Sequence, residues 1–158
     1  MSADMYSFLL HLHSVGRWVL LLLLLVAIFN SLVAGSRPFI RSDARTGFIL
    51  IIVADLMFLI GIALWFLNTK GIGHETLRTA HFSEIMKNSY QRFFFLEHPV
   101  GMLIAIILLH IGKAQGRKAI SDRAKHKRTL IFYFLALLII LATIPWPFLA
   151  KGAGSQWY

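Results

Sequence analysis

The chain has 158 residues, of which 58% are hydrophobic and 15% charged, and its 16 Lys and Arg against 7 Asp and Glu give a formal net charge of +9. This composition excludes a water-soluble enzyme, because a soluble fold does not carry so much apolar sequence. The chain has no cysteine, which excludes disulfides, iron–sulfur clusters, thiolate-bound zinc and c-type haem. Any metal centre would therefore use His, Met or carboxylate ligands.

Four apolar segments predict membrane-spanning helices at residues 6–34, 47–67, 93–112 and 130–149. Each is close to the roughly 20 residues that an α-helix needs to cross the hydrocarbon core. Helices are expected because lipid offers no hydrogen-bond partner to the backbone, so each span must pair its own N–H and C=O groups. The sequence predicts an all-α integral membrane protein, with residues 1–158 forming one four-helix up-down-up-down bundle.

Basic residues predict the orientation of this bundle. Residues 36–46 contain three Arg, and residues 113–128 contain seven Lys or Arg. Loops rich in Lys and Arg stay in the cytoplasm, so both termini and the loop 68–92 are expected outside. Trp65, Trp146 and Trp157 agree, since they fall near the outer interface. We expect a multi-pass protein of the bacterial inner membrane that contacts phospholipid headgroups and binds no nucleic acid.

The outer loop 68–92 predicts less regular structure. Gly71 and Gly73 favour a turn, and residues 77–86 favour a short amphipathic helix at the membrane surface. His74, His81, Glu75 and Glu84 are alternative candidates, with His11, for a hydrated zinc or copper site. Their spacing matches no compact ligand motif.

Two histidines occupy equivalent places in the first and third spans. The pattern His-x-Val-Gly occurs at His13–Gly16 and again at His98–Gly101. Each histidine lies several residues inside the outer end of its span, which at ~1.5 Å per residue is roughly 6 to 12 Å below the interface. An ionisable group at this depth usually marks a ligand, a proton path or a mutual pair.

These two histidines predict a haem site. Spans one and three of such a bundle face each other diagonally, so the imidazoles of His13 and His98 could reach one iron. Gly16 and Gly101 lie one turn further along, and we expect them to leave a flat face for the porphyrin. His11 lies ~200° around the helix from His13, so only one of the two can face the ligand. The sequence leaves open which of them does.

A resemblance supports haem. The residues His11-Leu12-His13, Arg17-Trp18, Glu97-His98 and Ile144-Pro145-Trp146-Pro147-Phe148 resemble an uncharacterised family of small four-helix bacterial membrane proteins labelled cytochrome b-like. The resemblance extends over the whole chain and implies haem b. His110 is the remaining histidine near the cytoplasmic end of a span, and no histidine in the second or fourth predicted span can partner it. We therefore expect at most one haem.

Buried charges allow two interpretations. Arg17 is expected to form an ion pair with Glu97 and Asp55, or else to contact a haem propionate or a quinone carbonyl. Asp55 could act instead as a proton acceptor. His110 is expected at the interface. Met57, Met86 and Met102 are expected to pack or face lipid, although Met102 could line a cofactor pocket.

The resulting prediction is an electron-transfer component, not a stand-alone catalyst. His13 and His98 would ligate one haem b near the outer face, Arg17, Glu97 and His11 would tune it, and quinone is a further candidate cofactor. A second hypothesis is a cofactor-free accessory or assembly subunit of a larger membrane complex, such as a respiratory complex. A third is a small transporter or metal-handling protein.

Overall fold

The computed structural model describes residues 3–67 and 80–148 and is helical throughout its regular parts. Two long helices come first, α1 (Ala3–Val33) and α2 (Arg41–Leu67). Two short ones follow, α4 (Phe82–Lys87) and α5 (Ser89–Arg92), and a π-helical turn, η2 (Phe93–Glu97), leads into α6 (His98–Gln115). The last helix is α7 (Asp122–Thr143).

Four helical stretches are long and apolar enough to cross a membrane: Asp4–Val33, Arg41–Leu67, Ser89–Gln115 and Asp122–Thr143. Their outward faces are apolar as well, with side chains such as Leu22, Phe29 and Leu59 exposed. A soluble monomer rarely exposes a large continuous apolar surface, whereas lipid solvates one readily. The predicted all-helical membrane class is therefore supported by both the helices and the surface.

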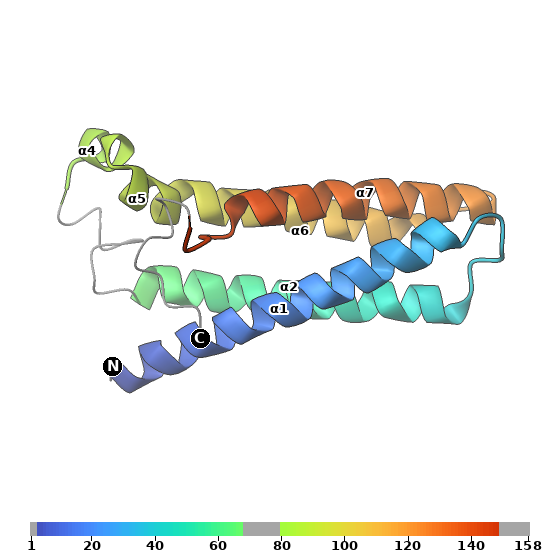
Figure 1. Ribbon diagram of the computed structural model, residues 1–158, viewed down its shortest axis with the longest axis horizontal. Helices are drawn as coiled ribbons and strands as arrows, with labels where there is room; N and C mark the ends of the chain where they lie inside the picture. The colour runs from blue at the N-terminus through green and yellow to red at the C-terminus, as the bar shows by residue number, and fades with distance from the viewer. Residues whose placement is uncertain (1–2, 68–79, 149–158) are drawn as a thin grey trace.

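The long helices pack as a ring of four. α1 packs against α2 and α7, and α6 packs against the same two helices. Figure 1 shows α1 running at an angle to the other three. The ring leaves α1 and α6 facing each other across its centre, as expected for the first and third spans. The core between them contains Leu24 of α1, Leu50 of α2, Leu109 of α6 and Ala136 of α7.

The helix boundaries differ from the predicted ones mainly at the basic segments. α2 begins at Arg41 and α7 at Asp122, so much of the predicted loops 36–46 and 113–128 is helical. Arg and Lys are good helix formers, and their long side chains can reach water while the backbone stays helical. Ser121 caps α7, its Oγ accepting a bond from the Ala124 amide at 3.3 Å.

The predicted fourth span, 130–149, extends further than the helix that the structure shows. α7 stops at Thr143, and Ile144 already has extended backbone angles, because the residue before a proline avoids the helical conformation and Pro145 follows. The predicted surface helix at 77–86 is seen in part as α4. Residues 77–79, as well as His74, Glu75 and Trp157, lie outside the described residues.

The α1–α2 and α6–α7 connections lie together at one end of the bundle, on the right in Figure 1. The Phe39 ring lies over the backbone of Gly116 and contacts the His126 ring, with centroids 5.1 Å apart. His126 corrects one prediction. Because α7 starts earlier than expected, the fourth helix does contain a histidine, and it is buried.

Candidate functional site

A cavity of about 680 Å³ lies between α1, α2, α6 and α7, in the half of the bundle that contains His13 and His98. Its volume is within the roughly 300–1,000 Å³ typical of small-molecule sites. The walls are largely apolar and aromatic, and they include Trp65, Phe94, Met102 and Ala105. The polar groups on the wall are few, and His13, Arg17 and His98 are among them.

The imidazole rings of His13 and His98 lie close together, edge to face, on the wall of this cavity. Their centroids are 6.3 Å apart and their planes are inclined by 73°. Two imidazoles joined by a direct hydrogen bond would have centroids about 5 Å apart. Two imidazoles bound to one metal ion would have centroids about 6 Å apart, given metal–nitrogen bonds of about 2 Å. The observed spacing is compatible with two ligands of one metal ion, and it also lies within the roughly 4.5–7 Å of an ordinary edge-to-face ring contact.

The backbone of α7 orients His98. Its Nδ1–H donates to the carbonyl oxygen of Thr143 at 2.7 Å. Since a carbonyl oxygen can only accept, Nδ1 carries the proton, and in the neutral ring Nε2 keeps its lone pair. This is the arrangement usual for a metal-ligating histidine, whose second nitrogen is held by a carbonyl or carboxylate.

His13 is positioned by α2. A Cβ atom at Gly61 would lie 3.2 Å from His13 Cε1 and 3.9 Å from Nδ1, so the missing side chain at Gly61 lets the ring approach the helix. His13 Nδ1 is buried and has no hydrogen bond of standard geometry with a described residue, and the backbone of Met57 on α2 is a weak hydrogen-bond partner of the ring. A buried ring nitrogen that is only weakly hydrogen-bonded is available to bind a ligand.

The π-helical turn η2 directly precedes His98 and positions it at the cavity. It ends at Glu97, directly before His98, and places the rings of Phe93 and Phe94 5.9 and 6.5 Å from the His98 ring. Such turns are rare and are found frequently at functional sites. No sequence pattern predicted it, because a π turn differs from an α turn only in which backbone groups pair.

The predicted ion pairs of Arg17 with Glu97 and with Asp55 are wrong, because both carboxylates have other partners. Glu97 Oε1 accepts from Arg92 Nε at 2.7 Å, and Asp55 Oδ1 is 3.0 Å from His110 Nε2. Arg17 lies on the cavity wall instead, with its guanidinium 5.3 Å from the centroid of the Trp18 ring. The prediction failed because it used depth alone, whereas the facing helix decides which side chains meet.

The predicted flat faces at Gly16 and Gly101 are not open. The Met57 side chain packs onto Gly16, and the Thr143 side chain packs onto Gly101, so these glycines permit close helix packing. They do not line the cavity, and neither do His11 and Glu97. His11 is exposed and its Nδ1–H donates to the Ser7 carbonyl at 2.7 Å. Of the two histidines, His13 is therefore the one in the cavity.

The alternative outer metal site finds no support among residues 3–67 and 80–148. No group of three or more His, Cys, Asp or Glu side chains is placed there to hold a metal ion. His81 and Glu84 instead cap α4, the Glu84 carboxylate accepting from the His81 amide at 3.1 Å.

Sequence reasoning missed three groups of the site: Gly61, Trp65 and the Thr143 carbonyl. A signal for the third was present, since Pro147 lies four residues after Thr143 and has no N–H to bond that carbonyl. The sequence contains no comparable signal for Gly61 or Trp65, because their roles depend on contacts with helices that are distant in sequence.

Comparisons with protein-family models, with curated proteins and with solved structures found no match to this chain. The resemblance to cytochrome b-like proteins therefore stays a prediction, and function has to be argued from the site itself.

Proposed function

We propose that this protein is a small membrane b-type cytochrome that carries electrons through one haem ligated by His13 and His98. In this proposal the chain is an up-down-up-down bundle of the bacterial inner membrane, with both termini outside. The haem would lie in the outer half, between α1 and α6. The observation that carries the proposal is the pair of imidazoles whose centroids lie 6.3 Å apart on the wall of a largely apolar cavity.

The properties of the two ring nitrogens support ligation. His98 presents an unprotonated Nε2 because Thr143 holds its Nδ1–H. The His13 ring is held only weakly, by the backbone of Met57, and its buried Nδ1 has no hydrogen bond of standard geometry with a described residue. Haem b needs no cysteine, and two histidines would suit a haem that carries electrons. When bound, haem would supply one-electron transfer, and two histidine ligands would leave no open position for substrate at the iron.

The remaining residues have supporting roles in this proposal. The aromatic wall, including Trp65 and Phe94, excludes water and lowers the local dielectric constant. Arg17 is the cation on the cavity wall that is best placed to meet a haem propionate or a quinone carbonyl. The Thr143 carbonyl fixes the tautomer of His98, and such a contact also strengthens the ring as a ligand. Quinol is the proposed electron donor.

The test is a visible spectrum of the detergent-purified protein from haem-replete cells, oxidised and then reduced with dithionite. A pyridine haemochrome assay gives the stoichiometry. We expect a sharp reduced α-band and one haem per chain, with His13→Ala and His98→Ala each lowering haem content at least about tenfold. His11→Ala is the matched control, since His11 is exposed and two residues from His13, and it should keep its haem.

The variant His98→Met distinguishes loss of a haem ligand from misfolding, because methionine can still ligate the iron. This variant should bind haem with a higher reduction potential, as His/Met ligation does. A colourless parental protein would exclude the proposal. So would a spectrum that survives both alanine substitutions.

One observation favours the second hypothesis, an accessory subunit. The Asp55–His110 pair lies on the outer surface of the bundle, with side chains 45% and 49% exposed. Ionisable groups inside a membrane usually avoid lipid, so a partner helix covering this face would explain them. Cross-linking from this face to another membrane protein, in a protein without haem, would support that hypothesis.

A further inference from the structure

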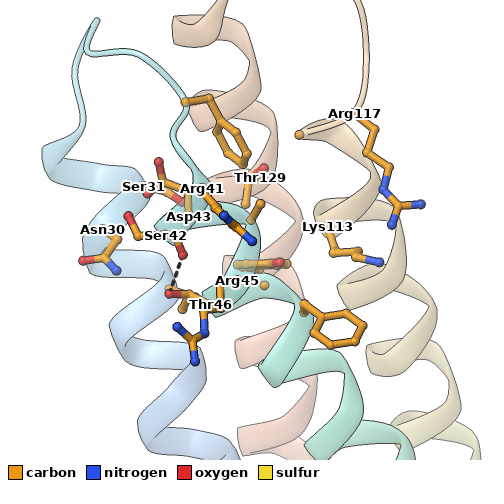
Figure 2. A pocket seen from close by; sticks show the side chains of 17 residues that line it. Asn30, Ser31, Arg41, Ser42, Asp43, Arg45, Thr46, Lys113, Arg117 and Thr129 are labelled. Carbon is orange, nitrogen blue, oxygen red and sulfur yellow. Dashed lines mark hydrogen bonds between the residues drawn. The ribbon is translucent and has the colours of Figure 1, made fainter.

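A second cavity lies at the opposite end of the bundle from the histidine pair. It has a volume of about 930 Å³ and is formed by the end of α1, the start of α2, the end of α6 and the first turns of α7. Figure 2 shows its lining, which combines basic side chains with hydroxyl and amide groups. None of its residues belongs to the proposed haem site.

Four cations line this cavity, from two segments far apart in sequence. Arg41 and Arg45 come from α2, and Lys113 and Arg117 come from the end of α6 and just beyond it. None of the four forms an ion pair with any described residue. Like charges around one cavity repel each other, so an anion bound between them would be stabilised by all four.

The acidic residue on the wall does not neutralise these cations. Asp43 accepts two hydrogen bonds from Arg37, each at 2.7 Å. The Arg37 guanidinium thus holds both carboxylate oxygens of Asp43, and Arg37 is not one of the four cations on the cavity wall. The positive charge of the cavity is therefore left without a carboxylate partner in the described part of the chain.

The floor and the wall indicate the kind of anion. Tyr133 is 2% exposed and closes the floor, and its hydroxyl fits there because Gly47 has no side chain: a Cβ atom would lie 2.9 Å from Tyr133 Oη. Asn30, Ser31 and Ser42 add neutral hydrogen-bond donors. Phe48 also lines the cavity while being 52% exposed, so the wall continues onto the apolar outer surface.

We propose that this cavity binds a phosphate-bearing anion, either the headgroup of an anionic phospholipid or a soluble phosphate ester. Convergent Arg and Lys side chains are the usual partners of phosphate oxygens, and basic pockets between membrane helices on the cytoplasmic side bind lipid headgroups. The proposal concerns one cavity with defined lining residues. It goes beyond the general attraction of basic loops to a membrane surface, and it does not depend on haem.

The experiment titrates the detergent-purified full chain with dioleoyl phosphatidylglycerol and counts bound lipid by native mass spectrometry. Dioleoyl phosphatidylcholine has the same acyl chains and serves as the neutral comparison. Removing two charges in Arg41→Gln/Arg45→Gln should weaken phosphatidylglycerol binding about thirtyfold. Arg123→Gln/Arg128→Gln is the matched control, because these two arginines lie in the same end of the bundle but not on the cavity wall. It should change binding by less than about twofold.

A second arm identifies the source of the phosphate. The thermal stability of the chain is measured with inorganic pyrophosphate in place of lipid. Stabilisation that is lost in Arg41→Gln/Arg45→Gln, without specific lipid binding, would assign the site to a soluble phosphate ester. Specific lipid binding without this stabilisation would assign it to a headgroup. The variant Arg41→Lys/Arg45→Lys keeps both charges and should retain binding. Binding that is lost in the Gln variant but kept in the Lys variant is then due to the missing charges and not to misfolding.

Two results would overturn the proposal. One is unchanged binding of both probes by Arg41→Gln/Arg45→Gln. The other is an equal loss in the control variant, which would mean that diffuse surface charge and not the cavity attracts the anion.

Discussion

At the scale of single residues, three backbone carbonyls that accept a hydrogen bond from the ring nitrogen of an aromatic side chain share a place in the sequence. They are Phe95 with Trp65 at 3.2 Å, Leu141 with Trp146 at 2.8 Å, and Thr143 with His98 at 2.7 Å. Each of these carbonyls lies four residues before a proline, namely Pro99, Pro145 and Pro147. A proline has no N–H to bond the carbonyl of the preceding turn, and lipid offers no water to replace it. Ring N–H groups take that role here.

This pattern predicts a coupling between Trp65 and Pro99. Trp65→Phe should lower the free energy of unfolding by about 1–2 kcal/mol, because it leaves the Phe95 carbonyl without its donor. In a Pro99→Ala background, where residue 99 regains an N–H, the same substitution should cost clearly less. The measurement is equilibrium unfolding in mixed micelles, followed by circular dichroism. An equal loss in both backgrounds would show that ring packing, and not the hydrogen bond, is responsible.

At the scale of the elements, the pairing of helices decides the fate of each ionisable group. Asp55 belongs to α2 and His110 to α6, and they meet because these two helices are neighbours in the ring. The predicted partner of Asp55, Arg17, belongs to α1, which also packs against α2. The sequence shows that Asp55 needs a polar partner within the membrane, but the rotation of α2 about its axis selects which neighbour supplies it.

The link between α2 and α6 predicts a compensation. His110→Leu should destabilise the protein by about 1–2 kcal/mol, because the Asp55 carboxylate loses its donor on an apolar surface. The double variant Asp55→Leu/His110→Leu removes both polar groups and should regain most of that loss. Unfolding in mixed micelles again gives the free energies. If the loss of unfolding free energy in the double variant equals the sum of the losses in the two single variants, the two residues act independently.

At the scale of the whole molecule, the order of the helices around the ring brings distant segments together at each end. At one end His13 of α1 meets His98 of α6 across the centre. At the other end the α1–α2 and α6–α7 connections lie side by side, and basic residues of α2, of α6 and of the segment after α6 line one cavity. Both candidate sites therefore depend on all four long helices being in place.

The proposed orientation of the bundle can be tested directly because the chain has no cysteine. Single substitutions Ser83→Cys, in the predicted outer segment, and Ser36→Cys, in the predicted cytoplasmic connection, are labelled with a membrane-impermeant maleimide in intact spheroplasts. The first should react at once, and the second only after permeabilisation. The reverse pattern would invert the orientation and place the histidine pair in the cytoplasmic half.

The sequence by itself determined the number of long helices, their approximate positions and the membrane as their solvent. These features depend on local hydropathy, length and the backbone's need for hydrogen bonds, which neighbouring residues settle among themselves. It also placed His13 and His98 at matching depths. The tertiary structure alone decided that Gly16 and Gly101 are covered by Met57 and Thr143, that Asp55 meets His110, and that four cations share a cavity. Such contacts depend on the rotation and tilt of each helix against its neighbours, which packing sets and periodicity does not.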